Sequence, residues 1–169
     1  IGWYQRNYGL EVEKEWLSNV PSTIGALRMA LGIFAKPGDG ILVQTPVFGP
    51  LTWAVEGAGQ RLIANPMKPV NGRYEIDFQD FEAKIKEHHP SMYLLVNPHN
   101  PTGRVYTREE LERLVDICYA NHVRIISDEV HGLILYGNRK HIPILGVNQK
   151  AKSISIQIVS LSKGFNIMS

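Results

Sequence analysis

A lysine near the carboxyl end of the sequence is the first candidate for chemistry. Lys163 follows an alternation of apolar and polar residues at 153–159, which predicts a half-buried strand, and two serines and a glycine surround it. If this lysine is buried, its pKa falls, because burial disfavours the charged ammonium, and a neutral amine is a nucleophile. Taken alone, the same residues also fit a surface lysine in a turn rich in serine and glycine.

Three further apolar runs are followed by residues that suit a binding site. These runs are 41–43, 92–96 and 123–127. In parallel sheets, ligands bind beyond the carboxyl ends of the strands, so the residues that follow the runs are expected to lie close together. They include an aromatic, an amide, and an acid followed three residues on by a histidine, namely Phe48, Asn100, Asp128 and His131.

A site for a dianion is predicted at the start of a helix expected over 22–35. Ser22 is a candidate N-cap, and apolar residues recur after it at helical spacing. The first N–H groups of a helix have no partner within the helix, and the helix dipole is positive at this end. The N–H groups of Thr23 and Ile24 therefore favour a bound phosphate.

The sequence gives little support to other chemistries. No GxGxxG follows a strand, as a nicotinamide site requires, and the GxxxxGK[ST] pattern of a P-loop does not occur. No CxxC, HxxxH or HExxH spacing occurs either, so we expect no metal site. Ser162, His131 and Asp128 have the residue types of a hydrolase triad. However, GxSxG is absent, and closeness in sequence does not supply triad geometry.

The elements that must position these residues alternate along the chain. From about residue 22 to 127, short apolar runs alternate with helical stretches of roughly 10–15 residues. Asp77 and Thr107 predict helix starts, Thr107 as part of a capping box with Glu110, and Asn71-Gly72 predicts a hairpin turn. This order is typical of βαβ units joined by right-handed crossovers. The sequence therefore predicts an α/β fold with a mostly parallel sheet.

Length and composition describe an ordinary globular domain. The chain has 169 residues, of which 44% are apolar and 20% are charged. The formal net charge of +2, without runs of like charge, gives no sign of nucleic acid binding. No apolar stretch approaches the roughly 20 residues of a membrane span, and the first residues do not have the pattern of a signal peptide. Cys118 is the only cysteine, which favours a reducing cytoplasm.

Three motifs, taken in order, resemble a known family. The resemblance is to the class I/II aminotransferase family of fold-type I enzymes that depend on pyridoxal 5′-phosphate (PLP), and in particular to its cystathionine β-lyase (C-S lyase) branch. It covers essentially the whole chain and implies a three-layer α/β/α sandwich, the large domain of a PLP-dependent transferase. The motifs are Asn97-Pro98-His99-Asn100-Pro101-Thr102-Gly103-Arg104, Ser127-Asp128-Glu129-Val130-His131 and Ser160-Leu161-Ser162-Lys163.

The resemblance implies a role for each polar candidate. Lys163 would bind PLP covalently and then move protons at the substrate Cα. Asp128 would pair with the pyridine nitrogen and keep it protonated, so that the ring accepts electrons. Asn100 would donate a hydrogen bond to the 3′ oxygen of the ring, with His131 near the same edge. Each of these residues also has a purely structural reading, as a turn lysine, a capping acid, a turn asparagine or an interior histidine.

The resemblance also implies contacts with the ring faces and the phosphate. Phe48 would stack on one face of the ring and Val130 would pack on the other, although Phe48 also reads as a core aromatic. In this branch tyrosine is usual at the position of Phe48, and the phenyl ring keeps the stacking surface. Another departure is Ser169, which stands where the family usually has glycine. The phosphate is implied to contact Thr23, Ile24, Ser160 and Ser162.

The expected function follows from the same resemblance. Residues 1–169 would form the PLP-binding large domain, without the N-terminal arm and the C-terminal small domain of the family, and would hold PLP weakly and turn over little. The activity would be that of a β-lyase that cleaves cysteine thioethers to a thiol, pyruvate and ammonia. The alternatives are a class I/II aminotransferase, against which His99 and His131 favour the lyase, and a non-catalytic binding or dimerisation domain. An amino-acid substrate, a homodimer and a cytoplasmic location are also implied.

Overall fold

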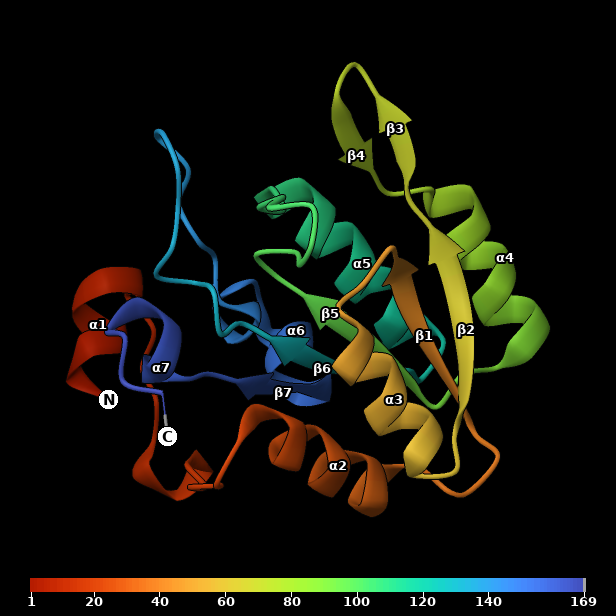
Figure 1. Cartoon of the computed structure of the whole chain (residues 1–169), viewed down its shortest axis with the longest axis horizontal. Helices are drawn as coiled ribbons and strands as arrows, with labels where there is room; N and C mark the ends of the chain where they lie inside the picture. Colours follow the sequence, from red (N-terminus) through yellow and green to blue (C-terminus); the bar gives the residue numbers. More distant parts are fainter. Residues whose placement is uncertain (169) are drawn as a thin grey trace.

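A parallel sheet forms the centre of the protein. The computed structural model describes residues 1–168 (Figure 1). Within them, five parallel strands pair in the order β2-β1-β5-β6-β7. Their bounds are β1 Gly40–Thr45, β2 Arg61–Pro66, β5 Met92–Val96, β6 Arg124–Asp128 and β7 Ser155–Ile158. A separate antiparallel hairpin of β3 (Lys68–Val70) and β4 (Arg73–Glu75) turns at Asn71-Gly72, as predicted, and projects beyond the sheet in Figure 1.

Helices cover both faces of the sheet. One apolar core joins α2 (Thr23–Phe34) and α3 (Gly49–Gly57) to the sheet. The other joins the opposite face to α4 (Phe78–His88), α5 (Arg108–Ala120) and α6 (Gln149–Ile154). The predicted three-layer α/β/α arrangement with a mostly parallel sheet is therefore confirmed.

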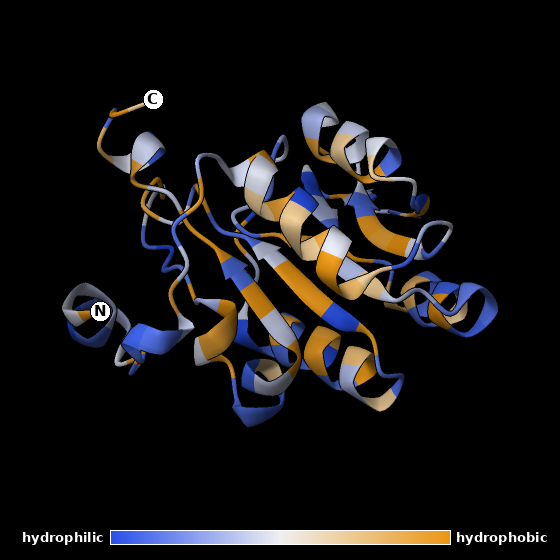
Figure 2. Cartoon of the chain, turned by 90° about the horizontal axis from the view of Figure 1, so that it is seen from below, coloured by the Kyte–Doolittle hydropathy of each residue, from blue (hydrophilic) through white to orange (hydrophobic). Residues whose placement is uncertain are grey.

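The central strand shows why the sheet must be covered twice. All five residues of β5 are buried, as its unbroken apolar run predicts for a strand with a helix layer on each side. Successive side chains point to opposite faces, so Tyr93 and Leu95 enter one core while Met92, Leu94 and Val96 enter the other. Figure 2 shows the strands as apolar segments between helices of mixed hydropathy.

Side-chain caps start the helices where the sequence predicted them. Ser22 Oγ accepts a hydrogen bond from the Gly25 N–H at the start of α2, and Asp77 caps α4 through the Asp80 N–H. Thr107 and Glu110 form the predicted capping box of α5. Each cap satisfies an N–H group that the helix itself leaves free, so each of these starts is fixed locally by the sequence.

The two ends of the described chain carry shorter elements. The first residues form α1 (Gly2–Tyr8), which ends at Gly9 with φ 64°, and a 3₁₀ turn at Lys14–Trp16. Another 3₁₀ turn, Ile144–Gly146, precedes α6, and α7 (Leu161–Gly164) follows β7. Ser169 lies outside the described residues. No helix in residues 1–168 is both long and apolar enough to cross a membrane.

The strand predicted at 153–159 is shorter than expected. Residues 153 and 154 end α6, and β7 begins only at Ser155. The reason is a cap that the alternating pattern conceals, because Asn148 Oδ1 accepts the Ala151 N–H and starts a helix whose Ala151 is fully buried. Local alternation thus gave the right element with the wrong start.

Candidate functional site

A pocket lies at the carboxyl ends of the parallel strands. Its volume is about 190 Å³. It collects residues from the start of α2, from the loops after β1, β5 and β6, and from α7, as expected for a ligand site of an open parallel sheet. We call it the Asp128 pocket, and its lining residues are Thr23, Ile24, Phe48, Leu51, Val96, Asn100, Asp128, Val130, His131 and Lys163.

Asp128 is the buried acid of this pocket. It is the last residue of β6 and is 7% exposed, and its Oδ1 accepts the Val130 N–H at 3.2 Å. Burial raises the pKa of Asp128 to about 6, and the nearby Glu129 carboxylate raises it further, against the Val130 hydrogen bond, which lowers it. No cation pairs with Asp128 within residues 1–168, so the carboxylate is ready to accept a charged donor from a ligand.

His131 and Lys163 line the same pocket. Burial lowers the pKa of His131, and the positive charge of Lys163 lowers it further, which favours a neutral imidazole. The Lys163 side chain is exposed, and its Nζ lies 3.8 Å from Met168 Sδ. The hypothesis of a buried lysine is therefore wrong for this structure, because α7 presents Lys163 at the mouth of the pocket.

Phe48 and Asn100 are joined through their backbones. The Phe48 N–H donates to the Asn100 carbonyl at 3.1 Å, which fixes the loop after β1 against the loop after β5. The second loop is itself closed by hydrogen bonds between His99 and its neighbours Gly103 and Arg104, each of 2.7 Å. The side chain of Phe48 remains 44% exposed, which leaves its ring available to a ligand.

His99 lies behind the pocket rather than on its wall. It is 2% exposed, its Nδ1 is 3.0 Å from Thr102 Oγ1, and burial together with the Arg104 charge lowers its pKa to about 4. Of the two histidines that favoured a lyase, only His131 therefore lines the Asp128 pocket.

The start of α2 supplies the pocket with backbone donors. Thr23 and Ile24 are its first two residues and both line the pocket. The Ser22 cap takes the Gly25 N–H and the Ser22 carbonyl takes the Ala26 N–H, so the cap does not use the N–H groups of Thr23 and Ile24. These two groups can therefore serve an anion.

Two predicted residues do not line the pocket. Ser160 caps α7, where its Oγ accepts the Ser162 N–H at 3.1 Å, and the two hydroxyl oxygens lie 2.8 Å apart. Ser160 lines a neighbouring cavity instead. The structure thus brings eight of the ten predicted residues to the pocket, the ten being Lys163, Thr23, Ile24, Phe48, Asn100, Asp128, Val130, His131, Ser160 and Ser162.

Two lining residues were missed in the sequence. Val96 is the last residue of β5, so a search that began at the strand end rather than just after it would have included Val96. Leu51 lies in the first turn of α3 and resembles any other buried leucine in the sequence. Across residues 1–168, no three His, Cys, Asp or Glu side chains are grouped so as to hold a metal ion.

Comparison with known proteins gives consistent matches. The profile of the family described as aminotransferase class I and II matches residues 1–169. Cystathionine beta-lyase PatB of Bacillus subtilis (strain 168) is 39% identical over 167 residues, which are 98% of this chain and 43% of that protein. A protein of Mycobacterium tuberculosis (strain H37Rv) named as a probable N-succinyldiaminopimelate aminotransferase, DapC, is 28% identical, over 96% of this chain and 41% of that protein.

A solved structure matches closely in shape. The PLP-bound C-S lyase from Staphylococcus hominis superposes with a TM-score of 0.91 and 33% sequence identity, over 98% of this chain and 42% of that one. The chain therefore spans less than half the length of the relatives it matches.

Proposed function

The chain belongs to the class I and II aminotransferase family, and we propose that it is the PLP-binding large domain of a carbon–sulfur β-lyase. The substrate class would be cysteine thioethers such as cystathionine, and the products a thiol, pyruvate and ammonia. Support comes from the 39% identity to a cystathionine beta-lyase over nearly the whole chain.

The observation that carries the proposal is the fit of the Asp128 pocket to PLP. A phosphorylated pyridine needs an anion site, an acid for the ring nitrogen, a flat apolar contact and an amine. The start of α2, the buried Asp128, the half-exposed Phe48 ring and Lys163 supply these four at one pocket. The unpaired burial of Asp128 is the most specific of them, because a buried carboxylate without a cation is costly unless a ligand pairs with it.

Lys163 is the residue that we propose moves protons. When bound, PLP supplies a ring that draws electrons from the substrate Cα. Lys163 Nζ would hold the cofactor in the resting protein, and would then remove the proton at Cα of an amino-acid substrate. Its exposed position in α7 leaves the amine free to reach the substrate.

The other side chains would hold and orient. The Asp128 carboxylate would accept the N–H of the ring, the Asn100 amide would donate to the 3′ oxygen, and the neutral His131 would lie at the same edge. Phe48 and Val130 would enclose the ring between an aromatic and an aliphatic surface. The N–H groups at the start of α2 would bind the phosphate, and Ser160 and Ser162 would join them by exchanging their mutual hydrogen bond for contacts with phosphate oxygens.

The second candidate is an aminotransferase of the same family. It is favoured by the 28% identity to DapC, and it needs the same residues up to loss of the Cα proton. The two differ in where the proton returns, because a lyase expels the thiolate from Cβ whereas an aminotransferase reprotonates the cofactor. Lysine and histidine at one pocket serve either course.

The products formed from cystathionine distinguish the two candidates. With PLP added, a lyase releases pyruvate and a thiol without a keto-acid partner, whereas an aminotransferase forms a keto acid only when a second keto acid is supplied. We expect slow pyruvate release, because the chain spans under half the length of its relatives. Keto-acid exchange without pyruvate would contradict the lyase. Bound PLP without turnover of either kind would favour the third reading, a non-catalytic binding or dimerisation domain.

We also propose a homodimer in the cytoplasm. The outer faces of α2 and α3 carry large exposed apolar side chains, with Ile33, Trp53 and Met29 exposed by 68%, 67% and 53%. Such a surface suits a second copy of the chain. Sedimentation analysis should show a dimer that Trp53→Glu converts to a monomer. The single buried Cys118 is compatible with a reducing compartment.

A further inference from the structure

A cluster of buried polar groups lies beside the end of β6, on the side away from the Asp128 pocket. It consists of Ser127, Glu129, His141 and the backbone N–H of Ile144, and we call it the Glu129 cluster. Ser127 Oγ and the Ile144 N–H both donate to Glu129 Oε1 at 2.8 Å, and His141 Nε2 lies 2.8 Å from Oε2. The side chains of Glu129 and His141 are only 1% and 2% exposed. None of these groups lines the Asp128 pocket.

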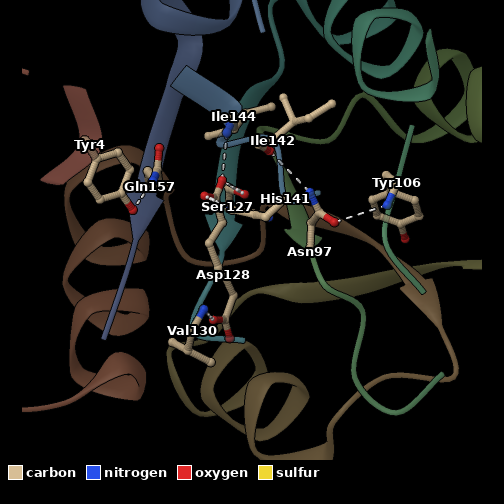
Figure 3. A network of polar contacts seen from close by, with 11 residues as sticks. Tyr4, Asn97, Tyr106, Ser127, Asp128, Val130, His141, Ile142, Ile144 and Gln157 are labelled. Carbon is tan, nitrogen blue, oxygen red and sulfur yellow. Dashed lines mark hydrogen bonds and ion pairs between the residues drawn. The ribbon is translucent and has the colours of Figure 1, made fainter. Parts of the chain in front are cut away.

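The cluster closes a long loop. The chain leaves β6 after Asp128 and enters the next turn, Ile144–Gly146, without any helix or strand between them. The tip of this loop, residues 136–140, is exposed. Glu129 at one end bonds to His141 and Ile144 at the other, so one carboxylate joins both ends of the loop (Figure 3). Loop closure costs entropy, and these contacts offset that cost at the base of the loop.

The closed end of the loop carries two residues of the Asp128 pocket. Val130 and His131 follow Glu129 directly, and the turn that contains them is held by the Gly132 N–H donating to the Glu129 carbonyl at 2.9 Å. A Cβ on Gly132 would lie 2.9 Å from His141 Cδ2, so the imidazole packs against the backbone of this turn. His141 therefore contacts both the carboxylate and the turn.

Val130 forms a wall shared by two cavities. It lines the Asp128 pocket on one side and, on the other, a cavity of about 440 Å³ that Glu129 and His141 also line. A shift of the Glu129 cluster would thus move Val130 against whatever occupies the Asp128 pocket. We propose that Glu129 and His141 are positioning residues, which hold the turn carrying Val130 and His131 in place against bound PLP. This inference rests on the proposed function.

The chemistry of the cluster favours a positioning role over simple stabilisation. His141 Nδ1 is buried and has no hydrogen-bond partner among the described residues, which costs stability. Buried polar pairs can often be replaced by apolar residues without loss of stability. What an apolar pair cannot supply is the acceptor for the Ile144 N–H and the fixed direction of the imidazole against Gly132.

Three variants and one control test the proposal. Glu129→Ala removes every contact of the carboxylate, and His141→Leu keeps the bulk beside Gly132 without the ring nitrogens. Glu129→Gln keeps an acceptor for Ser127 and Ile144, while its amide can donate to His141 Nε2 once the ring proton moves to Nδ1. Ile85→Ala is the control, because Ile85 is 2% exposed in the core around α4 and lies on the opposite face of the sheet from α2 and α3.

The measurements are the dissociation constant of PLP and the visible circular dichroism of bound PLP, which reports how the cofactor is oriented. We expect Glu129→Ala and His141→Leu to raise the dissociation constant by about tenfold, the scale of a lost supporting contact, and to change the dichroism. Glu129→Gln should rescue both to within about threefold of the unmodified chain. Ile85→Ala should lower the melting temperature and change neither.

Amide hydrogen exchange gives a readout that does not need the cofactor. The Gly132 and Ile144 N–H groups should exchange faster in His141→Leu and Glu129→Ala than in Ile85→Ala. If Glu129→Ala does not fold, Ser127→Ala replaces it, since that change removes one donor only.

Two outcomes would count against the proposal in different ways. If the unmodified chain binds PLP and the Glu129 and His141 variants bind it with equal affinity and dichroism, the positioning role is overturned and the proposed function stands. If the unmodified chain binds no PLP, the proposed function fails, and the inference fails with it.

Discussion

Two adjacent carboxylates at the end of β6 have opposite surroundings. Glu129 is buried among donors and bonds to Ser127, His141 and Ile144. Asp128 is almost as buried, but it accepts one backbone N–H, from Val130, within the described residues. Figure 3 shows Asp128 pointing toward Val130 and away from Ile144. Successive residues of a strand point to opposite faces, so one strand end supplies both environments.

The difference separates a structural acid from a functional one. A buried charge is tolerated when donors surround it, as they do around Glu129. Asp128 lacks such partners, and burial raises its pKa to about 6, which is the mark of a group that a ligand completes. The fold thus holds its loop with Glu129 and offers Asp128 to the pocket. Four changes test this contrast, and they are described from the largest expected effect to the smallest.

The largest effect is expected at Glu129. Glu129→Ala leaves buried donors at Ser127, His141 and Ile144 without an acceptor, so it should lower the free energy of unfolding by about 4 kcal/mol. Urea unfolding followed by far-UV circular dichroism measures the change, with Glu112→Ala, an exposed acid on α5, as the control. A loss no larger than that of the control would remove the structural half of the contrast.

Asp128→Asn should have the opposite sign. The pKa of Asp128 is raised from 3.8 to about 6 in the folded chain, so the folded state binds more protons than the unfolded state between these values. The PLP-free chain should therefore lose up to about 3 kcal/mol of stability as the pH rises from about 4 to 7. Asp128→Asn should lack this loss, and should thus be more stable than the unmodified chain at pH 7 while binding PLP more weakly.

Urea unfolding of both proteins at several pH values checks this sign. A stability that rises with pH between about 4 and 6, or a destabilised Asp128→Asn at pH 7, would show that Asp128 is held by partners as Glu129 is.

Much of this contrast was invisible in the sequence. Asp128 was predicted because it follows an apolar strand, a signal contained in a few adjacent residues. The partners of Glu129 are not, since His141 and Ile144 follow it by 12 and 15 residues across a loop without regular pattern. Helix starts at Ser22 and Thr107 were correctly predicted for the same reason, because a cap and its N–H lie three residues apart.

The errors have a common cause. The start of β7, the exposure of Lys163 and the pairing of Ser160 with Ser162 all depend on how α6 and α7 pack, and these are short helices of six and four residues. Short helices gain little from propensity and form where tertiary contacts and caps place them. Local patterns therefore predicted the sheet and most of the pocket, and they missed what was decided by packing near the end of the chain.

A smaller effect is expected on the aromatic side of the pocket. Phe48→Ala should leave the free energy of unfolding nearly unchanged, because the ring is already 44% exposed. It should weaken PLP binding by about tenfold, the value of one lost stacking contact. Phe48→Tyr keeps the ring and should bind as the unmodified chain does. Fluorescence titration with PLP measures both, and equal affinity for the alanine variant would exclude a stacking role.

The smallest effect is expected at the start of α2. Ser22→Ala removes the cap of the Gly25 N–H and should lower the free energy of unfolding by about 1 kcal/mol, whereas Ser22→Gly should cost only a few tenths. Neither should change PLP affinity by more than about twofold, because the cap leaves the Thr23 and Ile24 N–H groups free. Urea unfolding and PLP titration of the same samples give both values, and a larger loss of affinity would make Ser22 a phosphate contact.

The most direct test of the Asp128 pocket is chemical. The chain is incubated with PLP, reduced with borohydride, digested and mapped by mass spectrometry, with Lys163→Ala and the exposed Lys86→Ala on α4 as matched variants. We predict a single pyridoxyl adduct on Lys163, which is lost in Lys163→Ala and kept in Lys86→Ala. A folded chain whose adducts are spread over surface lysines, or that carries none, would contradict the assignment of this pocket to PLP.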